Sequence, residues 1–195
     1  MKILNRSFYQ RDTVIVAQEL LGKIVMRKIN GVTLAGIIVE TEAYCFDDDP
    51  ASHAYRGKTK RNAPMFGMVG YTYVYFIYGN HFCLNIVAKS ATTAAGALLI
   101  RALEPLQGIE VMRRYRYNNC LKEVTNGPGK LAQALQITTV HNFIDVTKNG
   151  SLFIVDKDIH LSRDIIATTR IGITVGSDKQ WRFCLRNNKW LSRKM

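Results

Sequence analysis

The first periodic stretch of apolar positions predicts a short amphipathic helix. Asp12 or Thr13 can cap a helix that runs through Leu21, and Gly22 provides the residue that ends it. Between these ends the apolar side chains recur at helical spacing, at Val16, Ala17, Leu20 and Leu21. We therefore expect one face of this helix to pack against the core.

The pattern then changes from helical to strand-like. The apolar runs 23–29 and 32–40 flank Asn30-Gly31, and an Asn-Gly pair tolerates the positive φ angles of a type I′ turn. The spacing predicts a β-hairpin whose second strand continues to Tyr44. By contrast, the stretch 46–64 has an acidic start, a basic end, two prolines and little periodicity, so we expect a long ordered loop there.

A second hairpin is predicted for Tyr71–Val87, where aromatic and β-branched residues lie on both sides of Gly79-Asn80. Four tyrosines fall within eight residues of it, at Tyr71, Tyr73, Tyr75 and Tyr78. Aromatic side chains on a hairpin can stack on nucleic-acid bases or wedge between them. Tyrosine-rich strands are more often one face of a buried core, so the hairpin alone does not decide between these interpretations.

The remaining elements follow from the same kind of pattern. We expect a strand over 96–103, a helix over 104–117 and a short helix after the Gly-Pro-Gly of 127–129. The C-terminal part predicts strands at 151–156, 165–175, 181–186 and 189–193. Helices combined with mostly hairpin-connected strands indicate the α+β class, and 195 residues suit a single domain over 1–195.

The charge balance adds a class of partner. The chain holds 27 Lys and Arg against 15 Asp and Glu, a net charge of +12, which favours encounter with DNA, RNA or another polyanion without choosing among them. No signal peptide or membrane-spanning stretch is evident, so we expect a cytoplasmic protein without a membrane partner. The four cysteines are widely spaced, which predicts reduced thiols and no metal site.

Three kinds of side chain in the predicted strands could do chemistry. Glu40 and Glu42 lie two residues apart, so a strand would place both carboxylates on one face, about 7 Å apart. Such a pair can divide acid and base roles in glycosyl transfer, or it can be two solvated glutamates on an edge strand. Arg101 in an apolar strand would need an anionic partner, for which either glutamate would serve, and a buried Asn85 would need hydrogen bonds. His53 has no partner that spacing can assign.

Several motifs, in chain order, resemble the alkyladenine (3-methyladenine, methylpurine) DNA glycosylase family. They are AQELLGKIVMR, IVETEAY, ASHAYRGKTKRNAPMFG, YVYFIYGNHFCLN, LLIRALEPLQG, NGPGKLAQAL and the closing RIGI, WRFCLR and W, spanning about Leu4 to Ser192. The resemblance implies a base-excision repair hydrolase that flips alkylated purines of the 3-methyladenine and 7-methylguanine type out of double-stranded DNA and leaves an abasic site. It implies a monomer without cofactors, and a largely antiparallel curved sheet with flanking helices and a protruding hairpin.

The resemblance also implies roles for individual residues. Glu42 matches the residue that activates the attacking water, Arg101 the residue that helps hold that water, and Tyr78 the intercalating wedge. The base pocket would comprise Tyr44, His53, Tyr75 and Asn85, with Asn85 excluding guanine's exocyclic amine. Apart from the resemblance, the basic residues Lys58, Lys60, Arg61 and Lys130 are candidate phosphate contacts, although such a residue is more often a plain solvated charge. No lysine stands at the matched catalytic position, which predicts a monofunctional enzyme without a Schiff base.

Two points in this resemblance need structural answers. A two-residue turn at Gly79-Asn80 would pair Tyr75 with Leu84 and turn Asn85 to the opposite face. A pocket that uses Tyr75 and Asn85 together therefore predicts a glycine bulge, or a three- or five-residue connection. The hairpin tip also carries His81, where the family often has another aromatic or polar residue, so the sequence does not decide whether hypoxanthine and ethenoadenine are processed. Glu40 is expected either to partner Arg101 or to be solvated.

Two other functions use the same surface. A non-catalytic binder of damaged DNA would keep the charge and the tyrosines while the carboxylates stayed solvated. An RNA-binding protein would use the same stacking platforms and basic side chains. The combination of Glu42 with Arg101 favours the enzyme over both alternatives.

Overall fold

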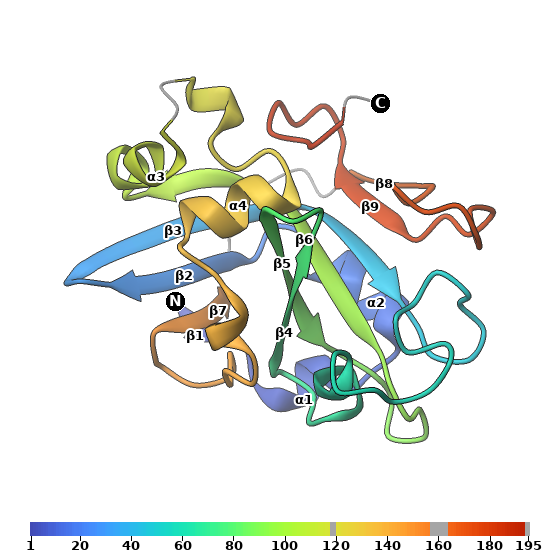
Figure 1. Cartoon of the computed structure of the whole chain (residues 1–195). Helices are drawn as coiled ribbons and strands as arrows, with labels where there is room; N and C mark the ends of the chain where they lie inside the picture. The colour runs from blue at the N-terminus through green and yellow to red at the C-terminus, as the bar shows by residue number, and fades with distance from the viewer. Residues whose placement is uncertain (118–119, 157–163, 194–195) are drawn as a thin grey trace.

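The computed structural model describes residues 1–117, 120–156 and 164–193. One curled antiparallel sheet dominates it, in the order β1-β7-β2-β3-β6-β5-β4, with β9 paired to β3 and β8 paired to β9 (Figure 1). The strands are β1 Lys2–Ile3, β2 Ile24–Ile29, β3 Val32–Tyr44, β4 Thr72–Ile77, β5 His81–Val87, β6 Ala97–Gln107, β7 Leu152–Asp156, β8 Ile165–Thr168 and β9 Arg182–Leu185.

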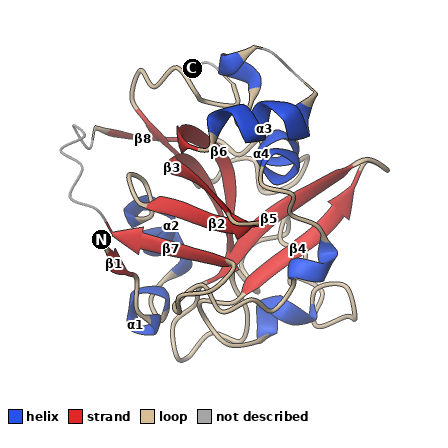
Figure 2. Ribbon diagram, turned by 90° about the vertical axis from the view of Figure 1, so that its left-hand side faces the viewer, coloured by secondary structure: helices blue, strands red, loops and turns tan. Residues whose placement is uncertain are grey.

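Short helices cover this sheet. Their bounds are α1 Arg6–Tyr9, α2 Thr13–Glu19, α3 Ile109–Arg116 and α4 Pro128–Ala134, with 3-10 turns at Ala63–Phe66, Leu121–Glu123 and Thr139–His141. Helix α2 packs on β3 and β6, while α4 packs on β5 and β6 with α3 beside it (Figure 2). The α+β class predicted from the sequence is confirmed. Within the described residues, no helix is long and apolar enough to cross a bilayer.

The two strongest local signals near the N-terminus are confirmed. The Asp12 carboxylate accepts hydrogen bonds from the Val14 and Ile15 amides at 2.9 and 3.0 Å, which makes it the N-cap of α2. Asn30 and Gly31 both have positive φ, 49° and 74°, between the paired strands β2 and β3.

Strand β3 lies inside the sheet, paired with β2, β6 and β9. Its side chains are buried from Leu34 to Ala43 on both faces, including the polar stretch Glu40-Thr41-Glu42. The expectation of two solvated glutamates on an edge strand is therefore wrong. A strand covered on both faces must instead supply partners for every polar group it carries.

The tyrosine-rich hairpin has the odd connection that the pocket requires. Ile77 pairs with His81, which leaves the three residues Tyr78–Asn80 as the connection, and Tyr78 and Gly79 have φ of 54° and 71°. Tyr75 consequently pairs with Cys83, and Tyr73 pairs with Asn85. The predicted three-residue alternative is confirmed. Strand β5 also pairs with β6 and packs on α4, so the expected protrusion of the hairpin stays a prediction.

Three predicted boundaries are wrong. The helix expected over 104–117 begins only at Ile109, because β6 continues to Gln107 in its pairing with β3 and Gly108 then turns with φ 74°. Of the strand expected over 165–175, only Ile165–Thr168 pairs, and 169–181 runs as an irregular segment. The described residues 189–193 form no strand. In the first case, pairing with β3 overrode the local helical pattern.

The pairing of β3 with β6 carries both glutamates and Arg101, and it depends on a close approach at Gly36. An added Cβ there would lie 2.9 Å from the Leu103 Cβ and 3.2 Å from the Glu104 carbonyl oxygen. We expect Gly36→Ala to lower the free energy of unfolding by about 1–3 kcal/mol, because neither neighbour can move away cheaply.

Urea unfolding measures this change. Gly150→Ala is the matched control, because a Cβ at Gly150 meets nothing within 4 Å. The free energy of unfolding of the Gly150→Ala control is expected to stay within about 0.5 kcal/mol of that of the parent. Equal effects of the two substitutions would contradict the role given to Gly36.

Candidate active site

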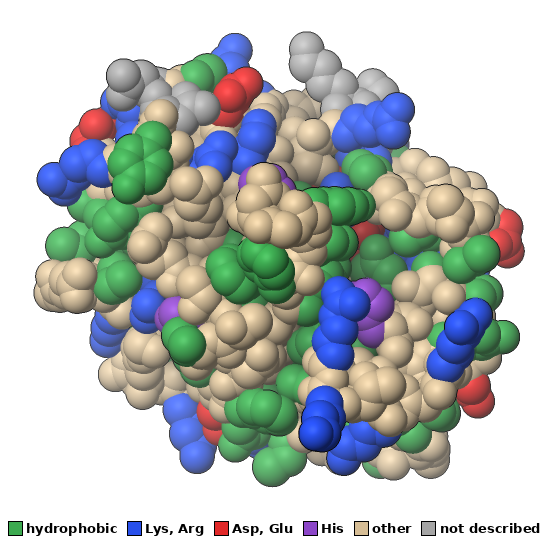
Figure 3. All heavy atoms as spheres, viewed as in Figure 1, with side chains coloured by type: hydrophobic (Ala, Val, Ile, Leu, Met, Phe, Trp, Pro, Cys, Tyr) green, Lys and Arg blue, Asp and Glu red, His purple; other side chains and the backbone are tan. Residues whose placement is uncertain are grey.

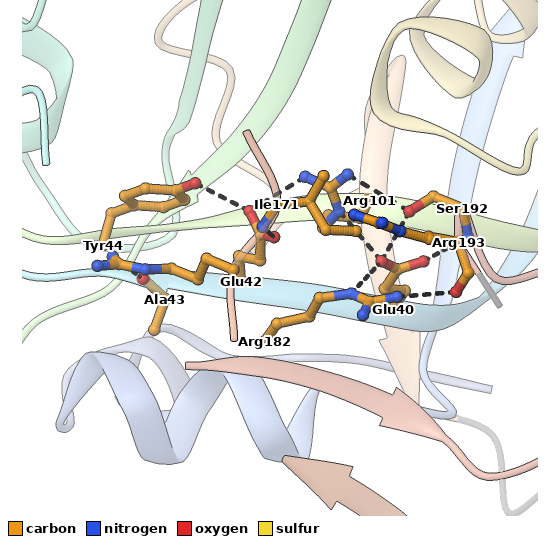
Figure 4. Close-up of polar contacts among 10 residues, drawn as sticks. Glu40, Glu42, Ala43, Tyr44, Arg101, Ile171, Arg182, Ser192 and Arg193 are labelled. Atoms are coloured by element: carbon orange, nitrogen blue, oxygen red, sulfur yellow. Dashed lines mark hydrogen bonds and ion pairs between the residues drawn. The ribbon is translucent and has the colours of Figure 1, made fainter. Parts of the chain in front are cut away.

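Two buried glutamates share one buried arginine at the centre of the sheet. Arg101 Nε donates to Glu40 Oε1 and Arg101 Nη1 donates to Glu42 Oε2, both at 3.1 Å (Figure 4). Both glutamates have no exposed side-chain surface. The anionic partner that the sequence demanded for Arg101 is thus supplied by both carboxylates, and the expected partnership of Glu40 with Arg101 is confirmed.

Segments from the C-terminal part complete this ionic cluster. Arg182 on β9 donates from Nε to Glu40 Oε1 at 2.7 Å. Ser192 donates to the same carboxylate from its amide at 2.6 Å and its hydroxyl at 2.7 Å, and its hydroxyl also accepts from Arg101 Nη2. These two residues were missed from the sequence, although Arg182 sits in an apolar strand pattern just as Arg101 does. Arg101 therefore has three of its donors fixed.

Glu42 receives two further hydrogen bonds. The Tyr44 hydroxyl donates to Oε2 at 2.8 Å, and the Ile171 amide donates to Oε1 at 2.7 Å. Burial first, and then the Glu42 carboxylate, raises the pKa of Tyr44 well above its usual value, so the phenol stays protonated and able to donate. All the groups that contact Glu42 here are donors, which stabilises a negative charge on it.

A cavity of about 320 Å³ opens directly beside this cluster. Tyr44, Arg101 and Ile171, the three residues that bind Glu42, all line it, as do His53, Tyr75, Tyr78 and Asn85. The volume lies within the range of small-molecule sites. Six of the residues predicted for the site, from four separate stretches of sequence, thus share one cavity, and the seventh, Glu42, contacts its wall.

The strand register explains why these residues converge. Leu99 on β6 pairs with Glu42 on one side and with Asn85 on the other, and Asn85 pairs in turn with Tyr73. Residues directly opposite one another across a sheet project to the same face. These four side chains therefore form a row on one face across four neighbouring strands, and those of Leu99, Asn85 and Tyr73 line the cavity together with Arg101, two residues along β6.

Aromatic rings form one wall of the cavity. The ring centroids of His53 and Tyr75 lie 4.7 Å apart, and those of Tyr73 and Tyr75 lie 5.4 Å apart. His53 Nδ1 and the Tyr73 hydroxyl share a hydrogen bond of 2.9 Å. Burial, and then the nearby Arg61 guanidinium, lowers the pKa of His53, so the imidazole is neutral at pH 7. Tyr73 was missed as a pocket residue, although its alternation with Tyr75 places both on one strand face.

The buried amide of Asn85 is satisfied by backbone carbonyls. Its Nδ2 donates to Tyr73 O at 3.0 Å and to Cys83 O at 3.2 Å. Both amide hydrogens are therefore committed, which leaves the side-chain oxygen as the acceptor that remains. Cys83 lines the cavity beside it and was not predicted from the sequence.

The lining of the cavity also includes Tyr78 at the hairpin tip, His81, Gly129 and Gly172. The Tyr78 side chain is 78% exposed. Basic side chains border a hollow with a histidine on the face seen in Figure 3. Of the predicted phosphate contacts, Lys58, Lys60 and Arg61 are exposed, with the Arg61 guanidinium 5.6 Å from the Tyr75 ring centroid, whereas Lys130 is half-buried and donates to Asn126.

The described part of the chain contains no group of three or more His, Cys, Asp or Glu side chains arranged to hold a metal ion.

Comparison with known proteins gives one consistent result. The family model of methylpurine-DNA glycosylase (MPG) matches residues 7–189. A protein of Carboxydothermus hydrogenoformans named "Putative 3-methyladenine DNA glycosylase" is 49% identical over 192 residues, covering 98% of this chain and all of the relative. A protein of the same name from Clostridium botulinum strain Loch Maree is 41% identical over 203 residues, covering 98% and 99%. The chain belongs to the methylpurine-DNA glycosylase family and is a DNA glycosylase, a hydrolase that acts on N-glycosidic bonds.

Proposed function

We propose that this single-domain protein excises alkylated purines of the 3-methyladenine and 7-methylguanine type from duplex DNA as a monomer. It flips the damaged nucleotide into the cavity, hydrolyses the N-glycosidic bond with a water activated by Glu42, and leaves an abasic site. The observation that carries this proposal is the position of Glu42, whose carboxylate is buried and held by three residues that all line one aromatic cavity.

The cavity suits a flat base that carries positive charge. Tyr44, Tyr75 and His53 line it, and aromatic faces attract a cationic ring by about 0.5–2 kcal/mol more than a neutral one. N3- and N7-alkylated purines carry such a charge. A base cannot reach this cavity while it is stacked in a duplex, so the nucleotide must rotate out at a cost of a few kcal/mol.

Tyr78 offsets part of this cost. It is exposed at the hairpin tip and borders the cavity mouth, where an aromatic ring can fill the space that the nucleotide leaves. The exposed Lys58, Lys60 and Arg61 lie on the loop that follows His53 and can contact phosphates on the same side. Lys130 is a weaker candidate, because its ammonium group already binds Asn126.

Glu42 then acts as the general base. The alkylated purine departs with the electrons of the glycosidic bond and leaves neutral, the water oxygen bonds to the sugar C1′, and Glu42 takes the water's proton. The same carboxylate stabilises the positive charge that develops on the sugar. Arg101 keeps Glu42 in place and can help to hold the water. Among the described residues that line the cavity there is no lysine, which supports a mechanism without a Schiff base.

Asn85 sets a limit on which purines fit. Its amide is fixed by two backbone carbonyls, so it cannot turn aside to accommodate a larger base. A rigid side chain at this point can exclude the exocyclic amine of guanine by steric conflict. 7-Methylguanine keeps this amine, so we expect its release to be slower than that of 3-methyladenine.

The first prediction concerns Glu42. Glu42→Gln keeps the size of the side chain but removes the base, so we expect the rate of base release to fall roughly 10²- to 10⁴-fold. Binding to damaged duplex DNA is expected to change little. Release of 3-methyladenine from methylated duplex DNA, measured by chromatography, gives the rate, and an electrophoretic shift gives the affinity.

Glu110→Gln is the matched control, because Glu110 is exposed on α3, where it pairs with Arg113, and does not line the cavity. It is expected to release the base at the parental rate. Substantial turnover by Glu42→Gln would reassign the base, and absence of release by the parent enzyme with DNA binding intact would defeat the proposal.

The second prediction concerns pH. The pKa of His53 is lowered below its ordinary value near 6.5, so the ring becomes positive only as the pH falls through that lower value. A positive His53 would repel a cationic base, so kcat/KM for 7-methylguanine release is expected to drop on the acid side. His53→Gln removes the titrating ring, so the decrease of kcat/KM at acid pH should be smaller in this variant.

The pH profiles should be measured between about pH 5 and 8. His141→Gln provides the control, because burial also lowers the pKa of His141 but this residue does not line the cavity. An acid limb that is the same in all three proteins would show that His53 is not its source.

A further inference from the structure

A fully buried ion pair lies behind the cavity and plays no part in the mechanism above. Arg170 donates from Nη1 and Nη2 to the two carboxylate oxygens of Asp49, both at 2.6 Å, and neither side chain has exposed surface. The residues are 121 positions apart in the chain. Arg170 also donates to the carbonyl oxygens of Ala43 and Gly176, so its guanidinium is held from several directions.

The guanidinium stacks on a ring of the base pocket. Its central carbon lies 4.7 Å from the Tyr44 ring centroid and 5.3 Å from that of Trp181. Tyr44 lines the cavity whereas Arg170 does not, so Arg170 occupies the side of the ring turned away from the cavity. The next residue, Ile171, donates its amide to Glu42. One dipeptide therefore supports both the stacking ring and the carboxylate.

Asp49 also binds two backbone amides of its own loop. Its Oδ2 accepts from the Cys45 amide at 3.1 Å and its Oδ1 from the Ala51 amide at 3.3 Å. These bonds shape the loop that leads from Tyr44 to His53. The ion pair thus joins the two loops that supply pocket residues on either side of Tyr44.

We propose that Asp49 and Arg170 form a specificity-determining pair that lets Tyr44 accept a positively charged purine. This inference rests on the proposed function. An arginine on the outer face of the ring positions Tyr44, but its charge would repel a cationic base on the inner face. The bidentate carboxylate of Asp49 neutralises that charge, so the ring is supported without a net positive field behind it.

The test compares two probes that differ by one charge. Duplexes would carry either 7-methylguanine, which is cationic, or 7-deaza-7-methylguanine, a neutral base of the same shape. Affinities would be measured in a Glu42→Gln background so that neither base is released. The readout is the ratio of the two Kd values, which does not depend on the active fraction of a preparation or on general attraction to DNA.

We expect Asp49→Asn to reduce the preference for the cationic probe about tenfold, because it leaves the Arg170 charge unpaired behind Tyr44. The double substitution Asp49→Asn with Arg170→Met removes both charges. It is expected to return the ratio to within about twofold of the parent, even where its absolute affinity is lower through loss of support for the ring. If Asp49→Asn alone folds poorly, Arg170→Met provides the reverse test, because it leaves the Asp49 charge behind Tyr44 without its cation and is expected to raise the preference for the cationic probe; an unchanged ratio in Arg170→Met would overturn the inference.

Asp145→Asn is the matched control. Asp145 pairs with Arg6, whose guanidinium stacks 5.2 Å from the Tyr71 ring centroid, and none of these three residues lines the cavity. The control is expected to keep the parental ratio. An unchanged ratio in Asp49→Asn would overturn the inference while leaving the proposed function intact.

If the parent protein binds the cationic and the neutral probe with equal Kd values, both this inference and the proposed stacking of a cationic base in the pocket are overturned. The parent enzyme, which has Glu42, should release 7-methylguanine. If it does not, the proposed function itself is overturned.

Discussion

The site depends on one constraint, which is that two carboxylates are buried side by side on β3. Ionised carboxylates can be removed from water only when cations and donors replace their hydration. Arg101 contacts both glutamates, Arg182 adds a second guanidinium to Glu40 Oε1, and the Ser192 amide donates to Glu40 Oε2. This requirement brings β6, β9 and the segment after β9 to the C-terminal part of β3, which is why residues near the end of the chain lie beside Glu40.

The same constraint fixes the orientation of the Glu42 carboxylate. Glu40 is saturated by its partners, so it fixes the Arg101 guanidinium rather than facing the cavity. Arg101 then presents a second edge to Glu42, and the Tyr44 hydroxyl and Ile171 amide complete a set of donors at the cavity wall. Two chemically identical side chains, two residues apart, thereby have different partners, and only those of Glu42 all line the cavity.

Sequence reasoning succeeded where short-range chemistry decides the structure. The Asp12 cap, the Asn30-Gly31 turn and the odd hairpin connection each depend on a few neighbouring residues or on strand parity. It failed where pairing over long distances decides, as at Glu104–Gln107, which reads as the start of a helix but completes β6. The ion pair of Asp49 with Arg170 was not predicted either, because no local pattern relates two residues that lie 121 positions apart.

The arrangement of charge resolves an apparent conflict in this protein. A chain with a net charge of +12 should repel a cationic base, yet the proposed substrate is one. Among the described residues, the buried carboxylates beside the cavity are Glu40, Glu42 and Asp49, and the buried guanidiniums that bind them are Arg101, Arg182 and Arg170. The buried charges of this group beside the cavity therefore balance, and positive charge in excess of them lies elsewhere, for example on Lys58 and Lys60, which face solvent. In the proposed function, exposed lysines such as Lys58 and Lys60 attract the phosphate backbone, whereas the buried charges beside the cavity compensate one another and add little net repulsion of a charged base.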